Sequence, residues 1–242
     1  MAEPDPYRET LDDPSLPFSF RWGLIREIDA TNRRFGVYRT FLREWSSFFQ
    51  ATDPASDGVF SVLEVGSGSG GLSRELLSWA RQHGHHPDLH LYDSQADVLE
   101  ESARQFDREN QPVTHIATED YLKAFPDNAF DYVISLHVLH HIRPFESAVE
   151  ALEQMHRIAR RGVLVMDFEN KPWAVPFARV WNRWGGVSPE LSRDGIKSLQ
   201  RAYEPRQLLR TVNSSAIRRS YEVKLRRLFF VPYWLLRSTR MG

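Results

Sequence analysis

Residues 59–71 read VFSVLEVGSGSGG, which predicts a buried strand, a glycine-rich turn and the start of a helix. The first seven residues include five apolar ones, as expected of a parallel strand that is covered on both faces. Gly66, Gly68 and Gly70 permit backbone torsions that are closed to other residues, and they let a ligand approach the main chain. Leucines recur at helical spacing after the turn, so the helix packs on the sheet while its N-terminal N–H groups face that ligand.

Two classes of ligand fit this turn. Gly66, Gly68 and Gly71 match the GxGxxG pattern of dinucleotide-binding folds, and Asp93 falls near the position of a ribose-binding acid. Glu64 favours the other class, because a dinucleotide fold normally keeps an apolar residue there and a carboxylate would repel a pyrophosphate. A carboxylate at this strand end suits a ligand that carries an ammonium group.

The segment EVGSGSG at 64–70 resembles the first motif of class I S-adenosylmethionine (SAM)-dependent methyltransferases, which is an acid, one residue and then GxGxG. A second match, AFDYVISL followed by HVLHH at 129–141, is similar to the branch of that family that acts on small molecules and on quinone or polyketide precursors. The resemblance covers residues 59–170. It implies SAM as cofactor and an α/β fold, a doubly wound, seven-stranded, mostly parallel sheet.

This resemblance also implies roles for residues at the predicted strand ends. Glu64 holds the ammonium group of SAM, and Asp93, whose alternative role is a helix cap alone, binds the ribose. Glu119 or Asp120 accepts from the exocyclic amine of adenine. His137, next to the transferable methyl group, is the candidate catalytic base or orients the acceptor. The other predicted cofactor contacts are Gly66, Ser67, Gly68, Gly70, Ser94 and Leu136, and packing or capping is the expected role of His140 and His141.

Further elements follow from apolar spacing and turn residues along the chain. Ser94 is the expected N-cap of the helix that follows Asp93. The predicted helices are 95–108, 146–161, 172–186 and 205–212, with a polar connector at 188–203, and the predicted strands are 89–92, 113–117, 129–136, 163–168 and a closing antiparallel pair at 216–223 and 225–231.

The domain organisation is read from shifts in composition. We expect residues 1–17 to be disordered, because prolines and acids dominate them. Apolar residues at spacings of three and four predict a two-helix cap at 18–50, which packs on the sheet and can also roof a substrate pocket. The methyltransferase domain is expected to span 51–242. Its segment 172–203, inserted after the fifth strand, is tryptophan-rich and is expected to form a lid, to lie on an apolar partner surface or to pack in the core.

The composition of the 242 residues excludes several kinds of site. The net charge of -1 provides no electrostatic reason to expect a nucleic-acid partner. The chain has no cysteine, so it has no disulfide and no thiolate metal site. The histidine-rich turn at 83–87 has no carboxylate at ligand spacing, and we therefore expect no metal site.

The two ends of the chain differ in charge. The acidic, proline-containing beginning is unlike a signal peptide, and no apolar run is long enough to cross a bilayer, so we expect a cytoplasmic protein. Residues 216–242 hold seven Lys or Arg and one Glu among aromatic residues. This segment is a candidate for peripheral membrane contact, and a closing strand with a solvated charged face is the alternative.

The expected function is methyl transfer from SAM to a hydrophobic small molecule, aromatic or polyketide-like, on oxygen or carbon. A sulfonium methyl group is already an activated electrophile, so the protein has mainly to align donor and acceptor and to exclude water. The alternatives are an NAD(P)-dependent oxidoreductase, which Glu64 disfavours, and a non-catalytic SAM-binding accessory protein.

Overall fold

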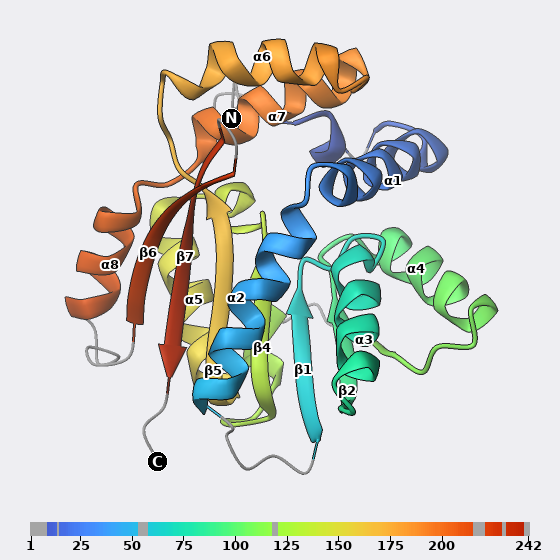
Figure 1. The fold of residues 1–242 in the computed structure, drawn as a ribbon, viewed down its shortest axis with the longest axis vertical. Helices are drawn as coiled ribbons and strands as arrows, with labels where there is room; N and C mark the ends of the chain where they lie inside the picture. Colours follow the sequence, from blue (N-terminus) through green and yellow to red (C-terminus); the bar gives the residue numbers. More distant parts are fainter. Residues whose placement is uncertain are drawn as a thin grey trace.

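A seven-stranded sheet forms the centre of the fold in the computed structural model, which describes residues 9–13, 15–52, 58–117, 121–214, 221–228 and 231–239 (Figure 1). The strand order β3-β2-β1-β4-β5-β7-β6 confirms the predicted mostly parallel sheet, in which β7 runs antiparallel to both of its neighbours. The strands are β1 (Val59–Val65), β2 (His86–Tyr92), β3 (Thr114–Ile116), β4 (Phe130–Leu136), β5 (Ala159–Phe168), β6 (Tyr221–Leu228) and β7 (Val231–Thr239).

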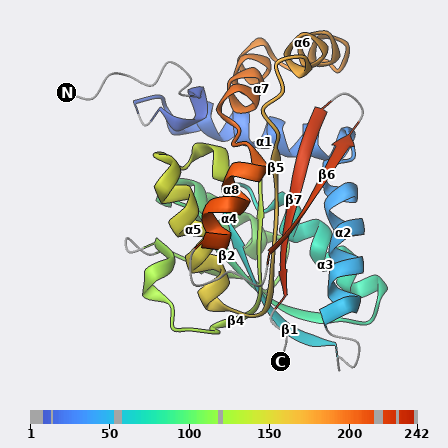
Figure 2. The same cartoon turned by 90° about the vertical axis from the view of Figure 1, so that its left-hand side faces the viewer.

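Helices cover both faces of the sheet and the carboxyl ends of its parallel strands. On one face, α2, α3 and α4 share a buried cluster with the sheet, and α5 and α8 cover the other face (Figure 2). Across the top of Figure 1, α1, α6 and α7 lie over the strand ends. The helices are α1 (Phe18–Arg34), α2 (Val37–Thr52), α3 (Gly71–Gln82), α4 (Ala96–Arg108), α5 (Phe145–Ile158), α6 (Ala174–Trp184), α7 (Pro189–Arg201) and α8 (Pro205–Ser214), with 3-10 turns η1 (Thr10–Asp12), η2 (Tyr121–Ala124) and η3 (Leu139–His141).

An aromatic cluster joins α2 to the sheet and to α3. Trp45 of α2 is fully buried, and its ring lies 5.1 Å from Tyr132 of β4 and 6.0 Å from Trp79 of α3. Phe49 and Phe60 complete the cluster at 5.7 and 6.1 Å from Trp45. The two helices predicted at 18–50 therefore have different places in the fold. Helix α2 packs on the sheet, and α1 crosses above the strand ends.

The helix predicted at 146–161 ends earlier than expected. Helix α5 stops at Ile158, and Arg160, Arg161 and Gly162 belong to β5, so the predicted helix end at 161 is wrong. Both arginines pair with the buried Asp131 of β4, at 2.7 and 3.0 Å. A Cβ on Gly162 would lie 2.4 Å from the carbonyl oxygen of Ser238, so the glycine permits close approach of β7.

Residues 188–203 contain a helix and are not the predicted polar connector. Helix α7 begins at Pro189, and the Ser188 hydroxyl accepts from the backbone N–H of Leu191 as an N-cap. Its inward face carries the polar side chains of Asp194, Ser198 and Arg201, all of them buried. The segment therefore shows only a weak helical repeat of apolar residues, and polar contacts hold the helix in place.

Those polar contacts are made with η1, which lies inside the segment 1–17 that we expected to be disordered. The backbone N–H and the hydroxyl of Thr10 each donate to the Asp194 carboxylate at 2.9 Å. Residues 1–8 and 14 lie outside the described residues.

The closing antiparallel pair exists but is shifted toward the carboxyl end, to β6 and β7. Tyr233, Trp234, Leu235 and Leu236 are at most 2% exposed in β7, where they pack in the core. Their burial contradicts a membrane contact by these residues, while Phe229 and Phe230 lie outside the described residues. Within the described part of the chain, none of the helices has the length and apolar character that a bilayer crossing needs.

Replacing Trp45 by alanine should lower the free energy of unfolding by about 3–5 kcal/mol, because a fully buried aromatic side chain is removed from a packed cluster. The matched control is Trp184→Ala on α6, whose side chain is 84% exposed and whose removal should change stability by less than about 0.5 kcal/mol. Urea denaturation followed by circular dichroism measures both. Equal effects of the two substitutions would contradict the central role of this cluster.

Candidate functional site

A cavity of about 350 Å³ lies at the carboxyl ends of the parallel strands, under α1, α6 and α7. The sheet order reverses between β1 and β4, and open α/β sheets bind ligands at such a switch point. The lining includes seven predicted cofactor contacts, Glu64, Gly66, Ser67, Gly68, Asp93, Ser94 and Leu136, and the predicted catalytic residue His137. Glu119 and Asp120 lie outside the described residues.

Glu64, at the end of β1, is a buried carboxylate in the wall of this cavity. It is 5% exposed, and its Oε2 accepts a hydrogen bond of 2.5 Å from the Ser73 hydroxyl of α3. Among the described residues, no lysine, arginine or histidine forms an ion pair with it. Burial raises the pKa of Glu64 to about 8. The site therefore holds a carboxyl group that a cationic ligand group would ionise.

The glycine-rich turn is held against β2 by its own backbone. The N–H groups of Gly66 and Ser67 both donate to the carbonyl oxygen of Tyr92, at 2.8 and 3.0 Å. Gly66 has φ +73°, and a Cβ there would lie 2.3 Å from Val138. Gly70 does not line the cavity. A Cβ on it would lie 2.4 Å from Phe106 of α4, so this glycine permits close packing against that helix, and its ligand contact stays a prediction.

Asp93 supports the turn from the end of β2. Its Oδ2 accepts from the N–H of Gly68 at 2.9 Å, and its Oδ1 accepts from the N–H of Gln95 at 3.0 Å. The predicted N-cap at Ser94 is wrong, because α4 begins after Gln95 and no cap bond comes from a side chain there. Each carboxylate oxygen of Asp93 has further acceptor capacity, so helix capping and ribose binding are compatible at this residue.

His137 follows β4 in a left-handed conformation, with φ +56°. Its backbone N–H donates to the carbonyl oxygen of Met166 at 2.8 Å, and its ring stacks on Phe168 with the centroids 4.0 Å apart. Burial lowers the pKa of His137 to about 4. The imidazole in the wall of the cavity is therefore neutral at physiological pH.

Sequence reasoning missed the contribution of Asp29 and Tyr38, which line the cavity from α1 and α2. The Tyr38 hydroxyl donates to Asp29 Oδ1 at 2.7 Å, and Arg33 forms an ion pair with Asp29 at 2.8 Å. A Cβ on Gly71 would lie 1.8 Å from Asp29 Oδ1. The third glycine of the GxGxxG pattern therefore makes room for a carboxylate of α1, and the pattern alone could not reveal that partner.

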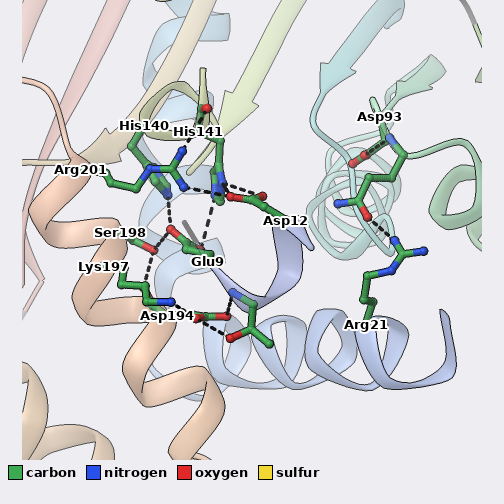
Figure 3. A network of polar contacts seen from close by, with 12 residues as sticks. Glu9, Asp12, Arg21, Asp93, His140, His141, Asp194, Lys197, Ser198 and Arg201 are labelled. Carbon is green, nitrogen blue, oxygen red and sulfur yellow. Dashed lines mark hydrogen bonds and ion pairs between the residues drawn. The ribbon is translucent and has the colours of Figure 1, made fainter. Parts of the chain in front are cut away.

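A second group of polar residues, also missed, lies at the other end of the cavity (Figure 3). His140 belongs to η3; its N–H donates to Asp167 Oδ2 at 3.0 Å and its Nδ1 lies 2.7 Å from Asp167 Oδ1. Burial opposes the charge of His140, but the Asp167 carboxylate outweighs it and raises the pKa to about 9. The sequence contained a sign of this contact. LHH follows the fourth strand and Asp167 lies near the end of the fifth, so both are at the carboxyl ends of parallel strands.

The roof of the cavity comes from α6 and α7. Ala174 and Ala178 of α6 are buried against Leu199 of α7, and Phe177 reaches the cavity while remaining 47% exposed. The predicted amphipathic helix at 172–186 is thus confirmed as α6, and it lies over the cavity with part of its apolar face toward solvent.

Comparisons with known proteins agree with this geometry. Residues 63–166 match the family model described as a methyltransferase domain. A highly reducing polyketide synthase from Alternaria alternata is 26% identical over an alignment of 156 positions, which covers 59% of this chain and only 5% of that protein's length.

Solved structures share the fold at low sequence identity. The plantazolicin methyltransferase BpumL aligns with a TM-score of 0.65 and 15% identity over 93% of this chain and 92% of its own. A SAM-dependent methyltransferase from Aquifex aeolicus aligns with a TM-score of 0.60 and 14% identity over 90% of this chain and 97% of its own. The magnesium protoporphyrin IX methyltransferase from Synechocystis PCC 6803 aligns with a TM-score of 0.54 and 19% identity over 95% and 90% of the two chains.

The family match covers the strands and the glycine-rich turn that build the cavity, and the fold comparison extends to the remaining helices and the closing strand pair. The family match therefore identifies residues 63–166 as a methyltransferase domain, and the low-identity structures show that the chain as a whole shares their fold.

Proposed function

We propose that this chain transfers a methyl group from SAM to a hydrophobic small molecule. The observation that carries the proposal is Glu64, a buried carboxylate with a hydroxyl partner and, among the described residues, no cation. The amino acid end of SAM supplies the missing positive charge. A dinucleotide would instead place its diphosphate near this carboxylate, which is electrostatically unfavourable.

The rest of the cofactor would follow the carboxyl ends of the strands. Gly66 and Gly68 offer backbone close to the ligand, and Asp93 accepts from the ribose hydroxyls while it holds the Gly68 N–H. Glu119 or Asp120 is our proposed partner for the amine of adenine. The relatives support this cofactor, because BpumL and the Synechocystis enzyme were both solved with the demethylated product SAH.

The chemistry requires alignment more than it requires a nucleophile. Holding the sulfonium methyl group and the acceptor in line lowers the activation barrier by about 7–11 kcal/mol. A general base would increase the rate of transfer to an oxygen acceptor by about 100- to 10,000-fold. His137 is neutral, but its low pKa makes it a weak base, so we propose that it mainly orients the acceptor against the methyl group.

The acceptor class follows from the lining of the cavity beyond the cofactor. Apolar side chains from α1, β5 and α6 dominate there and suit an aromatic or polyketide-like molecule. The names of the relatives support small acceptors, since they act on plantazolicin and magnesium protoporphyrin and the matched synthase makes a polyketide. The apolar residues are Ile25, Ile28, Phe35, Met166, Phe168 and Phe177.

Calorimetric titration with SAM, SAH and NAD tests the cofactor, and transfer of label from SAM to a panel of phenolic and polyketide acceptors tests turnover. We expect SAM and SAH to bind and NAD not to bind. Binding of NAD without SAM would overturn the proposal. Binding of SAM with no turnover on any acceptor would favour an accessory role.

Binding of SAH at pH 7 should release close to one proton, because Glu64 has a pKa of about 8 in the free protein and is ionised by the ligand's ammonium group. The affinity should therefore rise with pH up to about 8. Above that it should stop rising, because Glu64 is then already ionised in the free protein. Calorimetric titrations in buffers of different ionisation enthalpy measure the number of protons released on binding.

The Glu64→Gln variant should abolish this proton release and weaken SAH binding by about 10- to 150-fold, the effect of losing one hydrogen bond to a charged group, about 1.5–3 kcal/mol. Glu100→Gln is the matched control, because this glutamate is exposed on α4 and away from the cavity. Unchanged proton release in Glu64→Gln would assign the proton to another group.

Asp93→Asn should weaken SAH binding by about 10- to 150-fold, because the amide loses the charge and cannot accept from both backbone N–H groups and the ribose. The test compares SAH with an analogue that lacks the ribose hydroxyls, on the wild type and on the variant. If Asp93 binds the ribose, the two losses are not additive. Fully additive losses would leave Asp93 with the capping role alone.

A further inference from the structure

Two imidazoles and a carboxylate converge at the end of the cavity opposite the cofactor residues (Figure 3). The Nε2 of His140 lies 3.6 Å from Glu9 Oε1, and the Nε2 of His141 lies 3.8 Å from Glu9 Oε2. One donor atom from each of the three residues lies within 4.8 Å of the others. The two distances to Glu9 exceed by up to 0.5 Å the roughly 3.3 Å expected between ligands that sit 2.0–2.1 Å from a tetrahedral ion, so small side-chain movements would bring the ligands to that geometry.

Carboxylates on the far side of both rings orient these nitrogen atoms. His140 Nδ1 lies 2.7 Å from Asp167, and His141 Nδ1 lies 3.2 Å from Asp12. The Nε2 of His140 is fully buried, and the Glu9 carboxylate at 3.6 Å is beyond ordinary hydrogen-bond distance from it. Histidines that bind metals characteristically use the second nitrogen for such a carboxylate.

Glu9 is held in place although it lies near the start of the chain. Its Oε1 accepts from the Ser198 hydroxyl at 2.7 Å, and the side chain is 5% exposed. The next residue, Thr10, is bound to Asp194 through both its N–H and its hydroxyl. The carboxylate therefore meets the two histidines in a preorganised arrangement.

The cluster is rich in carboxylates. Those of Glu9, Asp12, Asp167 and Asp194 lie around the two imidazoles, and among the described residues Arg201 pairs with Asp12 at 2.9 Å and Lys197 pairs with Asp194 at 3.6 Å. Glu9 and Asp167 are buried, so a cation beside them is electrostatically favourable.

We propose that Glu9, His140 and His141 bind a divalent metal ion of the zinc class. Two imidazole nitrogens and one carboxylate oxygen are a ligand set that suits zinc, and they leave a fourth position toward the cavity. If the proposed function holds, an oxygen atom of the methyl acceptor can occupy that position and be polarised there. Metal binding itself does not depend on that function.

The test uses the tag-free protein after removal of metal with a chelator. Titration with Zn²⁺ should show one site per chain, Mg²⁺ should not bind, and Co²⁺ should show the visible absorption of a tetrahedral nitrogen and oxygen site. Glu9→Gln and His141→Gln should each weaken Zn²⁺ binding at least tenfold. They remove groups at the rim of the cluster, and thermal unfolding of each variant verifies that it is folded.

The matched control is His86→Gln, a replacement of an exposed histidine at the start of β2, which should leave Zn²⁺ binding unchanged. The proposal is overturned if the wild type takes up no Zn²⁺, or if neither variant weakens binding. In the first case the cluster is a hydrogen-bonded network without a metal ion. SAH binding is measured on the same samples, so a failure confined to Zn²⁺ leaves the proposed methyl transfer standing.

Discussion

The constraint on which this structure depends is the burial of Glu64 at the end of β1. An ionised carboxylate in that position is unfavourable until a cation joins it, so the free protein holds the group mostly protonated at neutral pH. The neighbouring features serve the same place. Ser73 fixes one oxygen, the glycine-rich turn clears the space above it, and Asp93 keeps that turn in shape.

The cavity has two ends with different construction. The cofactor end is built by strand ends and turns of the central sheet, where backbone N–H groups set the geometry. The other end is built by η1, η3 and α7, where buried polar side chains hold one another. The separation suits an enzyme with a common cofactor and a particular acceptor, because the second end can change without disturbing the first.

The sequence predicted the sheet and its glycine-rich turn well and the contacts between η1 and α7 poorly, for physical reasons. Strong apolar runs mark β1 and β4, and closely spaced glycines directly after a buried strand are typical of a ligand-binding turn, so the sheet and the positions of Glu64 and Asp93 could be inferred. Helix α7 buries Asp194, Ser198 and Arg201, so its pattern reads as polar and exposed. Their partners in η1 lie more than 180 residues away, and no local spacing reveals such contacts.

The attachment of η1 to α7 has a practical consequence for handling this protein. Residues 9–12 act as a wall of the cavity. A chain shortened to start at residue 13 would lose Glu9 and Asp12 and would open that end of the cavity to water. Truncations and tags should therefore leave this turn undisturbed.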